Sequence, residues 1–215
     1  MPLLGFLNRR QRFLDPGVLR DEELELVQPA RAYAPDFLRA TQHPDCAADP
    51  ECAVSADALT MFLDSHPRGL ERPDPRRGRP GAYRFWMRLH PRQPAAAPGG
   101  GTRHLPPPLP MAGTISLRIS DDENTRRYYG HVGYLVFPPA RGNHYAERSL
   151  RLLLPLARRH SMAELWITTN PDNLPSRRTC ERLGCEYVET VDLPPNHPLY
   201  HRGDRQKCRY RLPLV

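Results

Sequence analysis

The residues with the clearest chemical potential lie in the stretch FPPARGNHYAER, residues 137–148. This stretch joins an apolar segment, HVGYLVF, to a segment with helical periodicity, AERSLRLLLPLARR. At such a junction the backbone N–H groups of the helix start point outward, and the helix dipole adds partial positive charge. Arg141 and Arg148 could add charge from outside. The pattern predicts an anion-binding loop, although His144 stands where close approach of the chain favours glycine.

Hydrophobic periodicity predicts the elements that must position this loop. The expected strands cover residues 23–29, 82–90, 111–120, 131–137, 163–169, 185–193 and 205–214. The expected helices cover residues 30–42, 55–66, 144–160 and 170–184. Ser55 should cap the second helix, Pro155 should kink or end the third, and Gly184 should end the fourth. The order β-α-α-β-β-β-α-β-α-β-β predicts an α/β fold with one mixed sheet of about six to seven strands flanked by helices.

The length of 215 residues suits one domain with additional loops. Residues 1–21 are expected to form an N-terminal extension, and residues 22–215 the domain. The insert at about 91–110, PRQPAAAPGGGTRHLPPPLP, has almost nothing to bury and is expected to be disordered. The strands on either side of it, 82–90 and 111–120, should therefore pair as a hairpin with a long tip.

Composition excludes several classes of protein. No apolar run approaches the ~20 residues that a membrane-spanning helix needs, so no membrane partner is expected. The formal charge of +7 comes almost wholly from arginine, because Lys207 is the only lysine. The arginines are spread along the chain, which favours a solvated surface and makes a nucleic-acid partner improbable. The five cysteines are an odd number without zinc-site spacing, so we expect free thiols, no metal and a cytoplasmic location.

Three stretches resemble the motifs of the GNAT family of acyl-CoA-dependent N-acyltransferases. In VFPPARGNHYA, the matching positions of the family's strand and loop motif are Val136, Pro138, Arg141, His144 and Ala146. In NPDNLPSRRTCERLGC, the matching positions are Asn173, Ser176, Cys180, Gly184 and Cys185. The third stretch, GHVGYLVFP, is similar to the fourth strand of one branch of the family. The resemblance runs from about residue 22 to 212 and implies a single GNAT-like domain.

The resemblance implies that acetyl-CoA is the cosubstrate, with its pyrophosphate on the loop and its pantetheine in a gap where the fourth strand splays from the fifth. The residues expected to bind it are Leu135, Val136, Arg141, Gly142, Asn143, His144, Tyr145, Ala146, Asn173 and Ser176. In the family the backbone of the fourth strand, here around Leu135–Val136, donates to the oxyanion. His144 departs from the family's glycine, and at a helical φ it would be tolerated.

The family's reaction also needs an acid for the thiolate and a base for the amine. The usual tyrosine acid is replaced here by Cys180, which could donate a proton or could be a small core residue. Tyr187 or Tyr200 could substitute for it. For the base we favour His131, because histidine titrates in the useful range. Glu123, with its neighbour Asp122, is the rival.

The leading hypothesis is an N-acetyltransferase that transfers acetyl from acetyl-CoA to a small-molecule or protein amine by direct attack. The alternative is a non-catalytic GNAT-fold protein that binds acyl-CoA or has lost the site, and His144 and Cys180 favour it. The aromatic pair Tyr128–Tyr129 could line the acceptor pocket or pack at a sheet edge. The chain could also associate as a homodimer. The acceptor itself is not specified by these residues.

Overall fold

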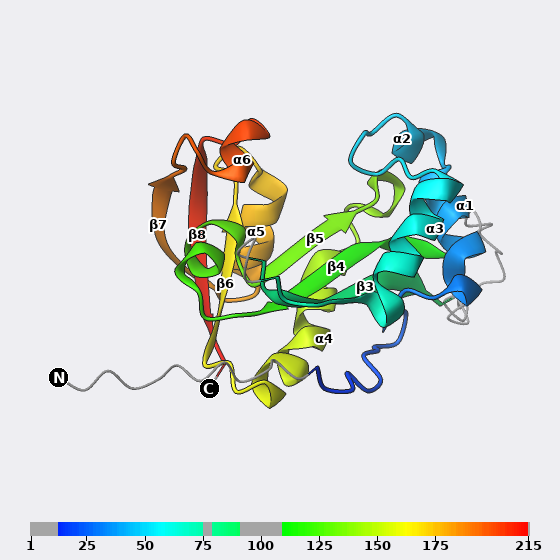
Figure 1. The fold of residues 1–215 in the computed structure, drawn as a ribbon, viewed down its shortest axis with the longest axis horizontal. Coiled ribbons are helices and arrows are strands. Elements are labelled where there is room, and N and C mark those ends of the chain that lie inside the picture. Colours follow the sequence, from blue (N-terminus) through cyan, green and yellow to red (C-terminus); the bar gives the residue numbers. More distant parts are fainter. Residues whose placement is uncertain (1–12, 75–78, 91–108, 215) are drawn as a thin grey trace, which may run out of the picture.

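The computed structural model describes residues 13–74, 79–90 and 109–214 (Figure 1). The strands are β1 (Leu24–Val27), β2 (Leu70–Glu71), β3 (Gly81–Leu89), β4 (Met111–Ile119), β5 (Val132–Val136), β6 (Glu164–Thr169), β7 (Glu186–Asp192) and β8 (Gln206–Pro213). The α-helices are α1 (Ala34–Thr41), α2 (Pro44–Ala47), α3 (Ala56–Ser65), α4 (Tyr145–Arg159), α5 (Leu174–Arg182) and α6 (Pro198–His201). The predicted α/β architecture is confirmed, and each predicted strand and helix has its counterpart.

The strands form two sheets rather than the one mixed sheet that we expected. The first has the order β1-β3-β4-β5, with β2 on the other part of β3, and the second has the order β6-β8-β7. Every ladder between these strands is antiparallel. The predicted hairpin of β3 and β4 is confirmed, with Phe85 opposite Ile115. Its tip lies outside the described residues apart from Leu109 and Pro110.

The two sheets meet where β5 and β6 begin to separate. At the start of β5, the N–H of His131 donates to the carbonyl of Trp166 at 2.6 Å. No ladder joins β5 to β6 in the described part of the chain, and Figure 1 shows the two strands diverging. A strand edge without a neighbour presents unpaired backbone groups. The divergence therefore leaves an open backbone edge on β5, beside α4 and α5.

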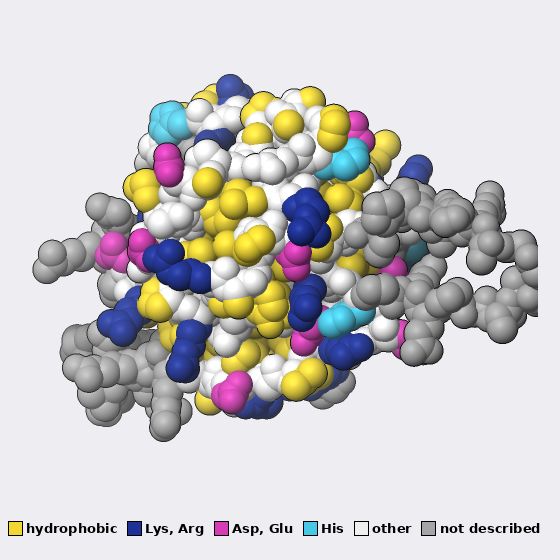
Figure 2. All heavy atoms as spheres, turned by 90° about the vertical axis from the view of Figure 1, so that its right-hand side faces the viewer, with side chains coloured by type: hydrophobic (Ala, Val, Ile, Leu, Met, Phe, Trp, Pro, Cys, Tyr) yellow, Lys and Arg dark blue, Asp and Glu magenta, His cyan; other side chains and the backbone are white. Residues whose placement is uncertain are grey.

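Both faces of the first sheet are covered, which explains why β3 and β4 are apolar along almost their whole length. Phe85 and Met87 belong to the core that α4 completes with Leu150 and Leu153. Trp86, between them, points to the other face and stacks on Phe37 of α1, with ring centroids 4.3 Å apart. On the side of α1 and α3, Figure 2 shows exposed hydrophobic side chains with arginines around them.

Two helix ends follow the sequence signals, and of the two outcomes expected at Pro155, a kink or an end, the end is not seen. Ser55 Oγ accepts the N–H of Ala58 at 3.1 Å, which confirms the predicted cap of α3. Gly184 follows α5 with φ of +77°, a conformation that suits glycine. Pro155, however, does not end α4, which continues through it to Arg159.

The expected N-terminal extension is described only from residue 13, and this part packs against the domain. Leu19 is buried in the core beneath the first sheet, and Phe13 packs against Tyr83 with ring centroids 4.9 Å apart. The backbone of Leu14 exchanges two hydrogen bonds with the Tyr83 hydroxyl, at 2.6 and 3.0 Å. Residues 13–21 thus close one end of the α4-side core.

Candidate active site

The loop between β5 and α4 has the outline of an anion-binding turn. After a 3-10 turn at Pro138–Ala140, Gly142 has φ of +87° and open space around its Cα. His144 is the N-cap residue of α4, with φ of +58°, and its side chain makes no capping hydrogen bond. The helical φ that would tolerate His144 is therefore not the one it adopts. A left-handed φ is uncommon for residues other than glycine, and histidine is among those that adopt it more often.

A cavity of about 550 Å³ lies over this loop and the start of α5, and we call it the loop cavity. Nine of the ten residues predicted to bind the cosubstrate line it: Leu135, Val136, Arg141, Gly142, His144, Tyr145, Ala146, Asn173 and Ser176. The tenth, Asn143, does not line it, because its amide turns back to donate to the carbonyl of Ala140 at 3.1 Å. The structure thus brings together residues from two motifs about 30 positions apart.

Arginine side chains gather around the loop cavity, and Arg182 among them pairs with Glu147 at 3.0 Å. Arg141, Arg178 and Arg182 line it. Arg141 also donates through Nε to the carbonyl of Val136 at 3.1 Å and pairs with Asp49 at 3.2 Å. The other arginine named with the loop, Arg148, does not line the cavity. Its guanidinium pairs instead with carboxylates before β1, so it anchors α4.

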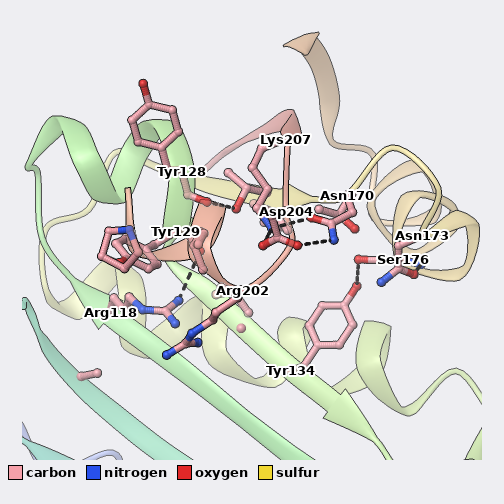
Figure 3. Close-up of a pocket in the computed structure, with 18 of the residues that line it drawn as sticks. Arg118, Tyr128, Tyr129, Tyr134, Asn170, Asn173, Ser176, Arg202, Asp204 and Lys207 are labelled. Carbon is pink, nitrogen blue, oxygen red and sulfur yellow. Dashed lines mark hydrogen bonds and ion pairs between the residues drawn. The ribbon is translucent and has the colours of Figure 1, made fainter. Parts of the chain in front are cut away.

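A second cavity of about 780 Å³ lies on the other side of the open edge of β5, and we call it the large cavity (Figure 3). Four residues line both cavities: Glu51, Tyr134, Asn173 and Ser176. The hydroxyls of Tyr134 and Ser176 are hydrogen-bonded at 2.8 Å at this junction. Burial raises the pKa of Tyr134 to about 12, so the phenol keeps its proton at neutral pH. A proton-bearing hydroxyl pair therefore stands where the two cavities meet.

The backbone of β5 also turns hydrogen-bonding groups toward this junction. The N–H of Phe137 donates to the carbonyl of Ala112, and the N–H of Arg118 donates to the carbonyl of His131. Hydrogen-bonded pairs alternate along an antiparallel ladder, so the amides of Gly133 and Leu135 face β4. By the same alternation, the amides of Tyr134 and Val136 face the open edge. Of the backbone N–H groups around Leu135–Val136 that were expected to donate to an oxyanion, those of Val136 and its neighbour Tyr134 are therefore the ones that face the open edge.

His131 lies outside both cavities and is a structural residue. It is buried, Nδ1 accepts the N–H of Trp166 at 2.8 Å, and Nε2 lies 2.8 Å from the carbonyl of Ser120. Since Nδ1 is an acceptor, Nε2 carries the proton and donates it to that carbonyl. Burial lowers the pKa of His131, which favours this neutral form. No ring nitrogen is left to take a proton from a substrate, so we do not assign His131 the role of base.

Cys180 and Glu123 also lie outside the loop cavity and the large cavity. Cys180 is fully buried, and a hydrogen bond with Cys185 together with burial raises the pKa of its thiol. This is the small core residue that the sequence left open as the alternative. The side chain of Glu123 is 86% exposed and lies 3.6 Å from Arg127. Asp122 bonds Ser120 and Thr125 within its own loop, and neither carboxylate lines a cavity.

Sequence reasoning missed three residues that the structure brings to the junction or next to it. Tyr134 was quoted only as part of a strand, and Glu51 was not singled out. Arg118 was not singled out at all, although it lines the large cavity with Tyr128 and Tyr129. Strand alternation places the Tyr134 side chain on the sheet face opposite to that of Gly133. It does not predict that Tyr134 forms a hydrogen bond with Ser176. Tyr187 and Tyr200, the proposed substitutes for the acid, line neither cavity.

Among the described residues, no group of three or more histidine, cysteine or acidic side chains could hold a metal ion. No helix of the described segments is long and apolar enough to cross a bilayer.

Comparisons with known proteins bear on the family and the fold. The family model described as an acetyltransferase (GNAT) domain matches residues 23–186. No curated protein sequence matches the chain. Several solved structures share the fold at low sequence identity. The ribosomal alpha-N-protein acetyltransferase RimL, solved with coenzyme A, has a TM-score of 0.58 at 15% identity, covering 91% of this chain and 97% of its own.

Two further structures support the same fold. The microcin self-immunity acetyltransferase MccE, solved with acetyl-CoA and AMP, has a TM-score of 0.55 at 16% identity, covering 90% of this chain and 93% of its own. A GNAT-family acetyltransferase from Bacillus anthracis has a TM-score of 0.56 at 13% identity, covering 92% and 98%. Because the family model spans most of the chain and the structures extend the likeness over its full fold, the chain belongs to the GNAT acetyltransferase family.

Proposed function

We propose that this protein is an acyl-CoA-dependent N-acyltransferase that transfers acetyl from acetyl-CoA to a primary amine by direct attack. The observation that carries the proposal is the meeting of two cavities at the Tyr134–Ser176 pair, beside the open edge of β5. One cavity suits a cosubstrate and the other an acceptor. RimL and MccE, which share the fold, were solved with coenzyme A and acetyl-CoA, which supports this choice of cosubstrate.

The loop cavity fits a pyrophosphate. The α4 N-terminus has no side-chain cap, and Gly142 leaves the loop surface open. An uncapped helix start with a partial positive charge is a suitable anion site. Arg178 lines the same cavity and adds a whole charge, and Arg182 lines it as well but pairs with Glu147 at 3.0 Å. Asn173 caps α5 through Ser176 N–H at 3.1 Å, which fixes the opposite wall.

When bound, acetyl-CoA supplies the acetyl group as a thioester. The Val136 N–H at the open edge of β5 is proposed to donate to the thioester carbonyl oxygen and to stabilise its developing charge. The Glu51 carboxylate, which lines both cavities, is proposed to take the proton that the attacking amine loses. The Tyr134–Ser176 pair holds a proton for the sulfur as the C–S bond breaks and the C–N bond forms. The products are an acetamide and a free thiol.

The proposed roles are tested by thiol release from acetyl-CoA across a panel of primary amines. We expect Tyr134→Phe and Ser176→Ala each to lower kcat by ~100-fold or more, with little change in acetyl-CoA affinity. The double variant should lose little more than either single one, because the two hydroxyls act as one unit. Acetyl-CoA binding without thiol release for any amine would favour the non-catalytic alternative.

Glu51→Gln tests the base separately. It should lower kcat/KM most at neutral pH and recover part of the loss at high pH, where the amine loses its proton unaided. A variant with an unchanged pH profile would exclude Glu51 as the base while leaving the cofactor proposal intact.

We also propose a cytoplasmic location. All five cysteines are free, and Cys180 and Cys185 are hydrogen-bonded to each other as thiols. Unbridged neighbouring thiols support a reducing compartment.

A further inference from the structure

Arg118 lines the large cavity and donates to neutral backbone carbonyls. Its Nη1 donates to the carbonyls of Gly130 at 3.1 Å and Tyr129 at 3.4 Å. No carboxylate of the described residues lies within ion-pair distance of it. Burial lowers the pKa of Arg118, which reflects the cost of keeping this charge away from water. Carbonyl oxygens offset that cost only in part, and a bound anion would offset it further.

The other cations of the large cavity divide into paired and unpaired groups. Arg84 is paired with Glu71 at 2.6 Å, and Lys207 with Asp204 at 2.8 Å. Two further arginines of the lining, Arg79 and, on the turn after α6, Arg202, make no ion pair within 4 Å with the described residues. Figure 3 shows the guanidinium groups of Arg118 and Arg202 on the same side of the cavity. Two guanidinium groups that line one cavity can bind a carboxylate, whose planar, bidentate geometry matches the guanidinium fork.

Gly133 keeps the Arg118 guanidinium open to the cavity. A Cβ at residue 133 would lie 3.4 Å from both terminal nitrogens of Arg118 and 3.3 Å from Ser116 Oγ. The approach to Ser116 Oγ is tighter than ordinary van der Waals contact and that to Arg118 is at its lower limit, so a side chain at residue 133 would lie directly against the guanidinium. Gly133 also sits next to Tyr134, so the open face of Arg118 adjoins the junction of the two cavities.

An apolar cavity of about 400 Å³ opens beside Arg118, between α3 and the first sheet. Val54, Ala58, Leu59 and Phe62 form its α3 side, and Trp86 and Ile115 lie on its sheet side. Arg84, Arg118, Gly133 and Tyr134 line both this cavity and the large one. Its volume is sufficient for an aromatic or branched aliphatic side chain.

We propose that the acceptor is an α-amino acid with an apolar side chain, an inference that rests on the proposed acetyltransferase function. Its carboxylate binds Arg118 and Arg202, its side chain enters the apolar cavity, and its amine faces Glu51 and Tyr134. The amine, carboxylate and side chain of an amino acid diverge from one carbon atom. In the protein, the arginines and Glu51 line the large cavity, and this cavity shares Gly133 and Tyr134 with the apolar one.

The test compares four primary amines in thiol release: L-phenylalanine, phenethylamine, L-phenylalaninamide and glycine. Phenethylamine lacks the carboxylate, the amide stands in for a peptide N-terminus, and glycine lacks the side chain. We expect kcat/KM for phenylalanine to exceed those of the other three by at least ~100-fold. Calorimetric titration of phenylalanine into the protein saturated with coenzyme A supplies a second readout that does not depend on turnover.

Variants separate the two parts of the acceptor site. Arg118→Lys and Arg202→Ala should each weaken phenylalanine binding by ~10-fold or more and leave acetyl-CoA binding unchanged. Ala58→Trp should fill the apolar cavity and raise KM for phenylalanine while sparing glycine. Met61→Trp is the matched control, because Met61 lies on the same helix, is 70% exposed and does not line the cavity.

The outcomes distinguish this inference from the proposed function. If acetyl-CoA binds and phenethylamine or phenylalaninamide is acetylated as well as phenylalanine, the amino-acid acceptor is overturned and the acetyltransferase stands. If phenylalanine binds the coenzyme-A-saturated protein but no amine releases thiol, the amino-acid site is supported and the proposed acetyl transfer is overturned. If phenylalanine neither binds nor reacts, the inference is overturned whatever acetyl-CoA does.

Discussion

His144 adopts the left-handed backbone conformation at the start of α4, which is strained for a residue with a Cβ. Its φ of +58° is shared by Ser161, just after α4, with φ of +57°. Both are residues with a Cβ in a left-handed conformation, which costs ~1–2 kcal/mol for an L-amino acid. His144 lines the loop cavity, whereas Ser161 lies at the other end of the helix and does not. The pair therefore allows backbone strain to be separated from ligand binding.

We expect His144→Gly and Ser161→Gly each to raise the free energy of unfolding by up to about 1 kcal/mol, as strain is relieved against a more flexible unfolded chain. Urea denaturation measures this. Only His144→Gly should change acetyl-CoA affinity in calorimetry, because only its side chain borders the proposed pyrophosphate site. Equal changes in affinity for both variants would show that the loop effect is not local.

His131 provides a second test at the scale of one residue. In His131→Gln, the amide can donate to the Ser120 carbonyl and accept from Trp166 N–H, as the neutral imidazole does. We expect kcat/KM to stay within about threefold of the wild type, whereas loss of a general base costs ~100- to 10,000-fold. A loss in that larger range, with the fold intact by circular dichroism, would restore His131 as the base.

The same variant should change how stability depends on pH. The pKa of His131 is lowered in the folded state by burial, so below about pH 6.5 the unfolded chain binds a proton that the folded one resists. The wild type therefore loses stability as the pH falls below about 6.5. The loss should be smaller in His131→Gln, as measured by urea denaturation at pH 7.5 and 5.5.

At the scale of elements, one ion cluster ties the segment before β1 to α4. Arg148 of α4 lies 2.7 Å from Asp21 and 2.9 Å from Glu23, both in the turn that leads into β1. Burial alone would raise the pKa of Asp21, but hydrogen bonds from Arg148, Leu24 N–H and Glu23 N–H outweigh it and lower the pKa to about 2. The cluster holds the helix that begins at the loop cavity against the edge of the first sheet.

We expect Asp21→Asn to lower the free energy of unfolding at pH 7 by about 1–2 kcal/mol, an amount reduced by partial exposure. Because the folded pKa lies below the unfolded one, this contribution is present above about pH 4 and is lost as the pH falls toward 2. Urea denaturation of both proteins along this pH range tests it. Asp36→Asn, in an exposed pair with Arg39, is the control and should change stability by less than about 0.5 kcal/mol.

The long elements could be predicted from the sequence because their patterns extend over many residues. The strand pattern of 82–90 and 111–120 gave β3 and β4 with their pairing, and Ser55 marked the start of α3. The short elements β2, α2 and α6, of two to four residues, carry too few positions for a period to appear. Pro155 was expected to disturb α4, but tertiary packing of Leu150, Leu153 and Leu156 carries the helix through it.

At the scale of the whole molecule, the site depends on how the two sheets are placed relative to each other. That placement could not be predicted from the sequence. The loop motif predicted the residues of the loop cavity because they are contiguous or belong to a second motif. The junction at Tyr134 and Ser176, and the open face of Arg118, arise from the divergence of β5 from β6. Period-two alternation assigns a side chain to a face but not to a partner 42 positions away.

The central claim is that acetyl-CoA binds across the loop cavity with its pyrophosphate at the start of α4. Calorimetric titration of acetyl-CoA into the full chain tests it most directly, with Arg178→Glu, which reverses a charge lining that cavity, and Arg39→Glu, which reverses an exposed charge elsewhere. We predict one site per chain, affinity reduced ~10-fold or more in Arg178→Glu, and no change in Arg39→Glu. Absence of binding at millimolar acetyl-CoA, or equal weakening by both variants, would contradict the account.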